Sequence, residues 1–150
     1  MTRPALLDVN VLIALFDATH VHHEPAHDWF ADNRAHGWAT CPITENGFVR
    51  VLTNPRAAVD AGRIPTIVER LKTFCGSGHH AFWPCNLSLR DDLFDLSCAR
   101  GYRQLTDVYL LGLAVTHRGR LATFDRSIPV KAVVGATPDT LAVIAPADGP

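Results

Sequence analysis

Short apolar segments alternate with longer segments of mixed polarity along almost the whole chain. The short segments are apolar or β-branched and predict buried strands, whereas most of the longer ones carry apolar side chains at helical spacing. Glycines, prolines and capping residues separate them. We expect strands at residues 5–7, 38–41, 81–83, 121–124, 130–134 and 141–144, and helices at residues 10–16, 22–35, 45–52, 65–74, 89–98 and 107–118.

This alternation of strands and helices is typical of an α/β fold. Strands that are joined through helices run parallel, and the helices then cover both faces of the sheet. The sequence therefore predicts a mainly parallel central sheet. We expect one domain over residues 1–145 and a frayed tail over residues 146–150.

Four acidic residues stand at the ends of the predicted elements. Asp8 and Asp125 each follow a strand, whereas Glu45 and Asp107 each begin a helix behind a threonine that can act as N-cap. With right-handed crossovers all four reach the carboxyl edge of the sheet, where ligands usually bind. Converging carboxylates repel one another unless a divalent cation neutralises them. The set predicts a metal site, although each acid taken alone is more simply a turn or helix-start residue.

Three polar residues next to these acids are candidates to support them. Asn10, Thr106 and Thr123 carry an amide or a hydroxyl, which can form a hydrogen bond with a ligand carboxylate or with its waters. A second acidic group, Asp91, Asp92 and Asp95, falls on the predicted helix 89–98. Leucines form the apolar stripe of that helix, so we interpret the acids as its solvated face.

The composition and charge of the chain exclude some classes of protein. With 47% hydrophobic and 19% charged residues, the 150-residue chain can build a packed core. The net charge of −1 argues against a broadly basic nucleic-acid binder and leaves phosphate binding to local arginines and metal. No apolar run has the roughly 18 residues that a membrane span needs, and the N-terminus lacks the pattern of a signal peptide. We therefore expect a cytoplasmic protein.

The four cysteines form no C-x-x-C pair. We expect Cys41, Cys75, Cys85 and Cys98 to be reduced, packed thiols, and we do not expect zinc or disulfide roles for them. Four histidines close to one another, residues 20, 22, 23 and 27, are interpreted as the exposed start of a helix.

Four motifs together resemble the PIN-domain nucleases, and most closely the VapC-type toxins of bacterial toxin-antitoxin pairs. They agree in order, type and spacing over about residues 6–144, and they are Leu6-Leu7-Asp8-Val9-Asn10-Val11-Leu12, Thr44-Glu45, Leu105-Thr106-Asp107-Val108-Tyr109-Leu110 and Ala122-Thr123-Phe124-Asp125. The resemblance implies a three-layer α/β/α sandwich. It also implies an endoribonuclease that depends on Mg²⁺ or Mn²⁺, with a small VapB-type antitoxin as partner.

The same resemblance implies roles for single residues. Asp8 would be the central bridging ligand, Asp107 and Glu45 would bind metal directly or through water, and Asp125 would bind or orient water for a second ion. Arg103 and Gln104, which precede the Asp107 helix together with Arg100, match the family's pattern and are the first choice for positioning RNA. Further basic residues that could ring the cleft, or simply keep the surface soluble, are Arg50, Arg56, Arg126 and Lys131.

Two other functions remain open, and two interfaces are expected. Haloacid-dehalogenase-like phosphatases also place an aspartate after the first strand, but they need a second one two residues later, where Asn10 stands here. Another metal-dependent phosphoryl hydrolase, or a catalytically silent domain that binds a partner, is still possible.

The apolar helices 10–16 and 45–52 indicate more burial than one small domain requires, so we expect a homodimer and a groove for the antitoxin.

Overall fold

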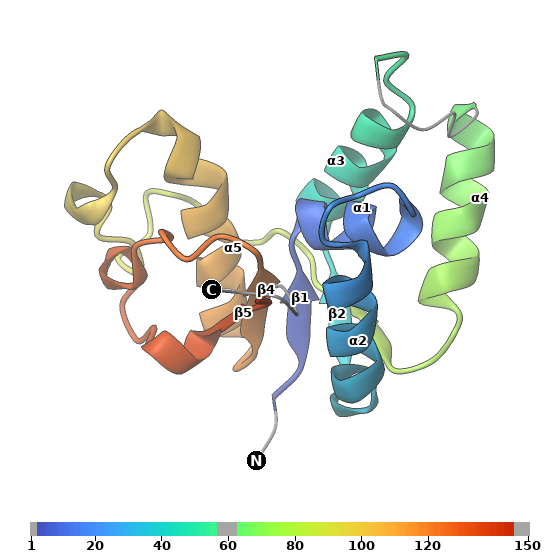
Figure 1. Cartoon of the computed structure of the whole chain (residues 1–150). Helices are drawn as coiled ribbons and strands as arrows, with labels where there is room; N and C mark the ends of the chain where they lie inside the picture. Colours follow the sequence, from blue (N-terminus) through green and yellow to red (C-terminus); the bar gives the residue numbers. More distant parts are fainter. Residues whose placement is uncertain (1–2, 57–62, 146–150) are drawn as a thin grey trace.

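A computed structural model describes residues 3–56 and 63–145 of the chain (Figure 1). Its sheet has five strands in the order β3-β2-β1-β4-β5, and every neighbouring pair is parallel. The predicted mainly parallel sheet is thus confirmed. The strands are β1 (Ala5–Leu7), β2 (Trp38–Thr40), β3 (His80–Phe82), β4 (Arg120–Thr123) and β5 (Leu141–Val143).

Helices cover both faces of this sheet. In Figure 1, α1 to α4 gather on one side and α5 lies on the other. Successive residues of β1 face opposite layers, since Leu7 packs in the core under α1 to α4 and Leu6 packs in the core under α5. The predicted three-layer sandwich is therefore confirmed. The helices are α1 (Val9–Phe16), α2 (His23–Asn33), α3 (Pro42–Leu52), α4 (Ile64–Cys75) and α5 (Leu105–Thr116).

The predicted helix over residues 89–98 is wrong. The segment forms turns and one short 3-10 turn, Leu96–Cys98. Side chains take the backbone hydrogen bonds that a helix would need, because Asp91 accepts one from the amide of Ser88 and Asp95 accepts one from the amide of Ser97. Asp91, Asp92 and Asp95 are nevertheless exposed, as expected of a solvated group.

The predicted strand over residues 130–134 is also wrong. Pro129 leads into a 3-10 turn, Val130–Ala132, and Val133 then forms an isolated antiparallel bridge with Phe94. Ala132 and Val133 pack in the core beneath α5, whereas Val134 is exposed, and the segment does not extend the sheet. The apolar content of residues 130–134 fits either a strand or a buried turn, so it could not distinguish between the two.

Two helices begin earlier than their predicted caps. α3 starts at Pro42 behind Cys41, and Thr44 lies inside its first turn, where its hydroxyl accepts a hydrogen bond from the amide of Cys41 at 2.9 Å. α5 starts at Leu105, so Thr106 is likewise inside the helix. The shift of α3 bears on the position of Glu45, whereas Asp107 stays in the first turn of α5 with either boundary.

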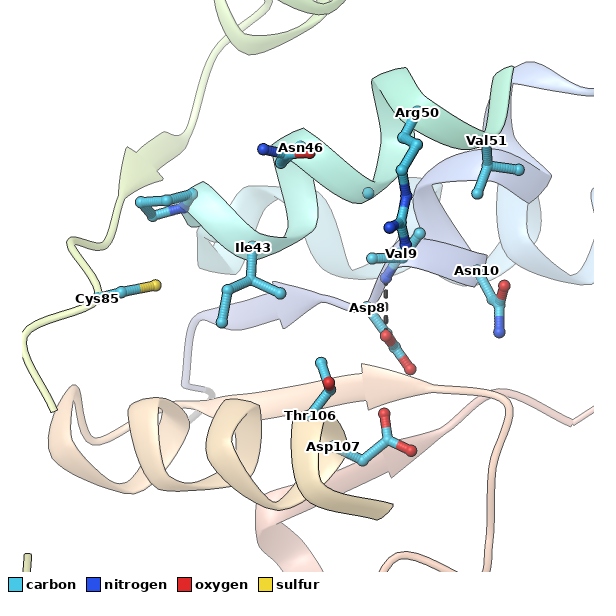
Figure 2. A pocket seen from close by; sticks show the side chains of 12 residues that line it. Asp8, Val9, Asn10, Ile43, Asn46, Arg50, Val51, Cys85, Thr106 and Asp107 are labelled. Carbon is cyan, nitrogen blue, oxygen red and sulfur yellow. Dashed lines mark hydrogen bonds between the residues drawn. The ribbon is translucent and has the colours of Figure 1, made fainter. Parts of the chain in front are cut away.

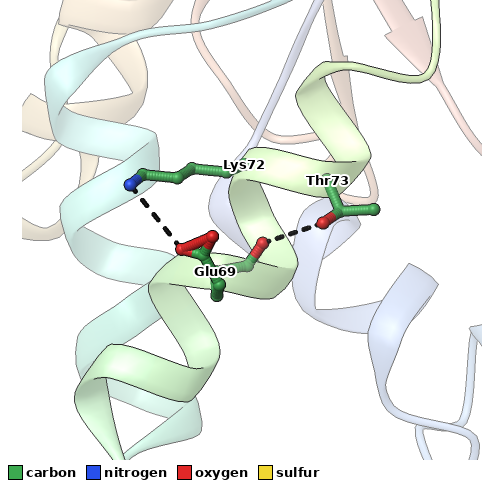
Figure 3. A network of polar contacts seen from close by, with 3 residues as sticks. All are labelled: Glu69, Lys72 and Thr73. Atoms are coloured by element: carbon green, nitrogen blue, oxygen red, sulfur yellow. Dashed lines mark hydrogen bonds and ion pairs between the residues drawn. The ribbon is translucent and has the colours of Figure 1, made fainter.

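Surface features away from the sheet edge contribute little to the fold. On α4 the exposed Lys72 and Glu69 form an ion pair at 3.6 Å, and Thr73 donates to the Glu69 carbonyl at 3.1 Å (Figure 3). Such exposed pairs are worth less than about 1 kcal/mol.

Among the described residues, no helix is long and apolar enough to cross a membrane. The expected tail, residues 146–150, lies outside the described residues.

Candidate metal centre

Asp8 is held rigidly where β1 meets α1. Its side chain is buried, and it acts as the N-cap of α1, with Oδ1 accepting from the amide of Val9 at 2.7 Å. Its other oxygen, Oδ2, accepts from the Thr123 hydroxyl at 2.9 Å. Two neighbouring strands therefore fix one carboxylate at the carboxyl edge of the sheet.

Asp107 and Asp125 complete a group of three carboxylates around this point. Burial, followed by the negative charges of Asp8 and Asp125, raises the pKa of Asp107 to about 6. Burial also raises the pKa of Asp8, against the hydrogen bonds from Thr123 and Val9, and Asp125 adds to the increase. These mutual effects show that the three groups repel one another, which is the electrostatic condition that a divalent cation relieves.

Thr123 and Ser127 order the loop that carries Asp125. The Thr123 hydroxyl accepts a hydrogen bond from the amide of Asp125 at 3.1 Å while it donates to Asp8. Asp125 Oδ1 accepts from the amide and the hydroxyl of Ser127 at 2.8 and 2.6 Å. Thr123, predicted as a supporting residue, thus contacts both Asp8 and the backbone of Asp125.

A pocket of about 590 Å³ opens beside Asp8 and Asp107 (Figure 2). Asn10 and Thr106, both predicted as supporting residues, line it, whereas Asp125 lies outside its lining. The opposite wall is α3, from which the Arg50 side chain extends toward Asp8 (Figure 2). The α3 residues in the wall are Pro42, Ile43, Asn46, Gly47, Arg50 and Val51.

Glu45 does not join the three aspartates. It is not among the described residues that line the pocket, because it lies two residues from Gly47 and hence roughly 160° away around the helix. Its carboxylate instead accepts a hydrogen bond from the Thr40 hydroxyl at 2.6 Å and faces Cys75 and His80. The expectation that all four acids share one cleft is therefore wrong for Glu45, because α3 begins three residues earlier than predicted.

The residues predicted to position RNA lie on a neighbouring surface. Gln104 donates to the carbonyl of Ser127 at 3.2 Å and accepts from the amide of Arg100 at 2.8 Å, which ties their loop to the Asp125 turn. Arg103 is exposed, and its guanidinium lies 5.8 Å from the centre of the Tyr102 ring. Gln104 and Arg100 therefore lie next to the Asp125 turn, and none of the three residues lines the pocket.

Comparison with known proteins identifies the family. The model of the PIN domain matches residues 5–133 of the chain. The chain is a PIN-domain protein. Among curated relatives from Mycobacterium tuberculosis, Ribonuclease VapC44 is 45% identical over 141 residues, which cover 93% of this chain and 99% of the relative. Ribonuclease VapC38 is 46% identical, with 83% of this chain and 86% of the relative covered, and Ribonuclease VapC39 is 41% identical, with 87% and 95% covered. The resemblance to VapC-type PIN ribonucleases is confirmed.

The sequence did not single out Asn46 and Gly47 as parts of the PIN-domain pocket. Helical spacing would have grouped them with Arg50, since residues three or four apart share a helix face. Gly47 has a steric role, because a Cβ built there would lie 2.8 Å from Val9 Cγ2 and 3.3 Å from Val9 Cγ1. The glycine lets α3 approach α1 at Val9, whose amide donates to Asp8.

Replacing Gly47 by alanine should therefore lower the free energy of unfolding by about 1–3 kcal/mol, because Val9 and the start of α1 must shift. Chemical denaturation with matched baselines measures this. Gly101→Ala is the control, since Gly101 has an extended backbone and nothing within 4 Å of its built Cβ. Equal stability of the two variants would show that α3 and α1 are not in tight contact at this point.

Proposed function

We propose that this VapC-type protein is a metal-dependent endoribonuclease, the toxin of a toxin-antitoxin pair. The single observation that supports this most is the group formed by Asp8, Asp107 and Asp125 beside an open pocket, where burial and the charges of the other two acids raise the pKa of Asp107 to about 6. Its relatives carry the name ribonuclease, which favours RNA over other phosphodiesters.

The donor set fits Mg²⁺, with Mn²⁺ as a substitute. Mg²⁺ prefers oxygen ligands, keeps several waters and is usually bound by one or two carboxylates together with phosphate oxygens. Asp8 and Asp107 would hold the ion directly, and Asp125 would hold it through water. When bound, such an ion polarises the phosphodiester and makes a water molecule more acidic.

The chain's own side chains prepare this pocket. Thr123 and the amide of Val9 leave Asp8 in one orientation, so its free lone pairs point to a fixed position. Asn10 and Thr106 offer an amide and a hydroxyl to bound waters at the pocket wall. Asp125, fixed by Ser127, would orient the attacking water.

Arg50 is the basic residue best placed to hold the scissile phosphate. It reaches into the pocket from α3, opposite Asp107, so its guanidinium offsets the repulsion between the acids and an RNA backbone (Figure 2). Arg100 and Arg103 would bind a flanking phosphate on the Asp125 side, with Gln104 fixing their loop. The substrate would be a tRNA, a ribosomal RNA or an mRNA.

A VapB-type antitoxin and a second copy of the chain are the proposed protein partners. Val51, which lines the pocket at the end of α3, and Ile64 at the start of α4 are 39% and 59% exposed, so both offer apolar surface to a partner. The proposed compartment is the cytoplasm, where both RNA and antitoxin are available.

Removal of metal tests the proposed activity. We expect EDTA-treated protein to leave a labelled RNA intact, and addition of Mg²⁺ or Mn²⁺ to restore cleavage by at least about 10³-fold over the EDTA sample. Denaturing gels of the RNA measure the rate, and inhibition by the purified antitoxin tests the partner. Full cleavage in EDTA would exclude the metal mechanism, and no cleavage of any RNA with either ion would favour a silent, partner-binding domain.

A further inference from the structure

A second group of metal-binding side chains lies on the far side of α3 from the acidic pocket. Glu45 of α3, Cys75 at the end of α4 and His80 at the start of β3 each offer one ligand atom, and these atoms all lie within 4.8 Å of one another. The three side chains are partly buried, so an ion can reach them from solvent. None of these groups takes part in the nuclease centre proposed above.

Thr40 orients two of the three groups. Its buried hydroxyl donates to Glu45 Oε2 at 2.6 Å and lies 2.7 Å from His80 Nε2. A hydroxyl has one proton, and an ionised carboxylate can only accept it, so Nε2 of His80 must be the donor in the second hydrogen bond. This leaves the lone pair of Nδ1 free to bind a metal. Metal-binding histidines commonly donate their other ring N–H to such an oxygen.

We propose that Glu45, Cys75 and His80 form a site for Zn²⁺ or a similar divalent transition-metal ion, with water in the fourth position. A thiolate with an imidazole favours zinc-type ions, whereas Mg²⁺ prefers sites built from oxygen alone. In a tetrahedral zinc site neighbouring ligand atoms are roughly 3.5 Å apart. Because the ligand atoms of Glu45, Cys75 and His80 lie up to 4.8 Å apart, the three side chains would have to approach one another by up to about 1 Å on binding.

Metal at this position would link three separate elements of the fold. Glu45 belongs to α3, which also carries Arg50 and Gly47 in the wall of the nuclease pocket. Cys75 and His80 flank the Gly76–Gly78 turn between α4 and β3. Binding releases the proton of the thiol and fixes the distance from α3 to α4, so it stabilises the folded state.

The test uses Co²⁺ and Zn²⁺ on metal-free protein that carries Asp8→Asn and Asp107→Asn, so that the acidic pocket does not compete. We expect Co²⁺ to give a thiolate-to-cobalt charge-transfer band, and one equivalent of Zn²⁺ to abolish it and raise the Tm. Cys75→Ser should remove the band and weaken binding at least about 100-fold, the upper end of what outer-shell changes cause. Cys98→Ser, a cysteine in the Leu96–Cys98 turn, should leave both unchanged.

His80→Gln provides a second variant in case Cys75→Ser does not fold, as judged by circular dichroism. It should keep the thiolate band but weaken Zn²⁺ binding at least about tenfold. Absence of the band in the parent protein, or equal Zn²⁺ affinity of the parent and Cys75→Ser proteins, would overturn the proposal. Neither result depends on RNA cleavage, so failure of this site and failure of the nuclease assignment are distinguishable.

Discussion

Replacing Asp8 by asparagine is expected to lower the rate of RNA cleavage by about 10³-fold or more while the protein stays folded. Asp8 is the only one of the three aspartates, among the described residues, whose two oxygens are held by both an α1 amide and a β4 hydroxyl. Asparagine keeps the shape and removes the negative charge that a divalent ion needs. Single-turnover cleavage of a labelled RNA at saturating Mg²⁺ measures the loss.

Asp92→Asn is the matched control for this change. Asp92 is exposed and lies in the turns before Phe94, so the same substitution there should leave the rate within about twofold of wild type. Thermal denaturation of both variants checks that they are folded. Cleavage by the Asp8 variant at the wild-type rate would remove Asp8 from the centre.

Replacing Asp107 by asparagine should stabilise the metal-free protein at pH 7.5. The pKa of Asp107, about 6, lies above its ordinary value of 3.8, so the folded state favours the protonated carboxyl. The favourable contribution of Asp107 to the free energy of unfolding is fully present below pH 3.8. It decreases as the pH rises from about 4 through 6, because the carboxyl then ionises beside Asp8 and Asp125. Asparagine removes a cost of about 1–2 kcal/mol, after allowance for solvent screening at a half-buried site.

The expected increase in Tm is about 3–6 °C in EDTA at pH 7.5, and it should fade toward pH 4. Excess Mg²⁺ should reverse the order, because the wild-type protein gains stability from the ion and the Asp107→Asn protein gains less. Differential scanning calorimetry at both pH values, with Asp92→Asn as control, measures both effects. A variant that is less stable than wild type in EDTA at pH 7.5 would mean that the carboxylates do not repel one another.

Strand and helix ends explain why three of the four acids could be placed from the sequence. Asp8 and Asp125 come after short apolar segments that predict strands, and parallel pairing of β1 with β4 brings both to one edge. Asp107 lies in the first turn of α5 whether the helix begins at residue 105 or 107, so the error in that boundary had little effect. The local sequence pattern places each acid after a strand or at the start of a helix, and the folded sheet then brings these acids close together.

Glu45 shows what the sequence could not settle. Thr44 has the residue type of an N-cap, but α3 begins at Pro42, and the Thr44 hydroxyl accepts from the amide of Cys41 inside the first turn. Glu45 faces Cys75 of α4 instead of the pocket. The contact of α3 with Val9 at Gly47 is tertiary, and the local sequence pattern did not reveal it. For the same reason Cys75 and His80, which are distant from Glu45 in the sequence, gave no sign of a shared site.

The position of a bound ion in crystals tests the central claim most directly. Crystals of the metal-free protein soaked in Mn²⁺ should show an anomalous peak in the pocket, within roughly 2.0–2.4 Å of a carboxylate oxygen of Asp8 and one of Asp107, and within reach of Asp125 through water. Asp8→Asn crystals should lack that peak. A pocket without manganese in wild-type crystals, under conditions in which the same protein cleaves RNA with Mn²⁺, would contradict the account.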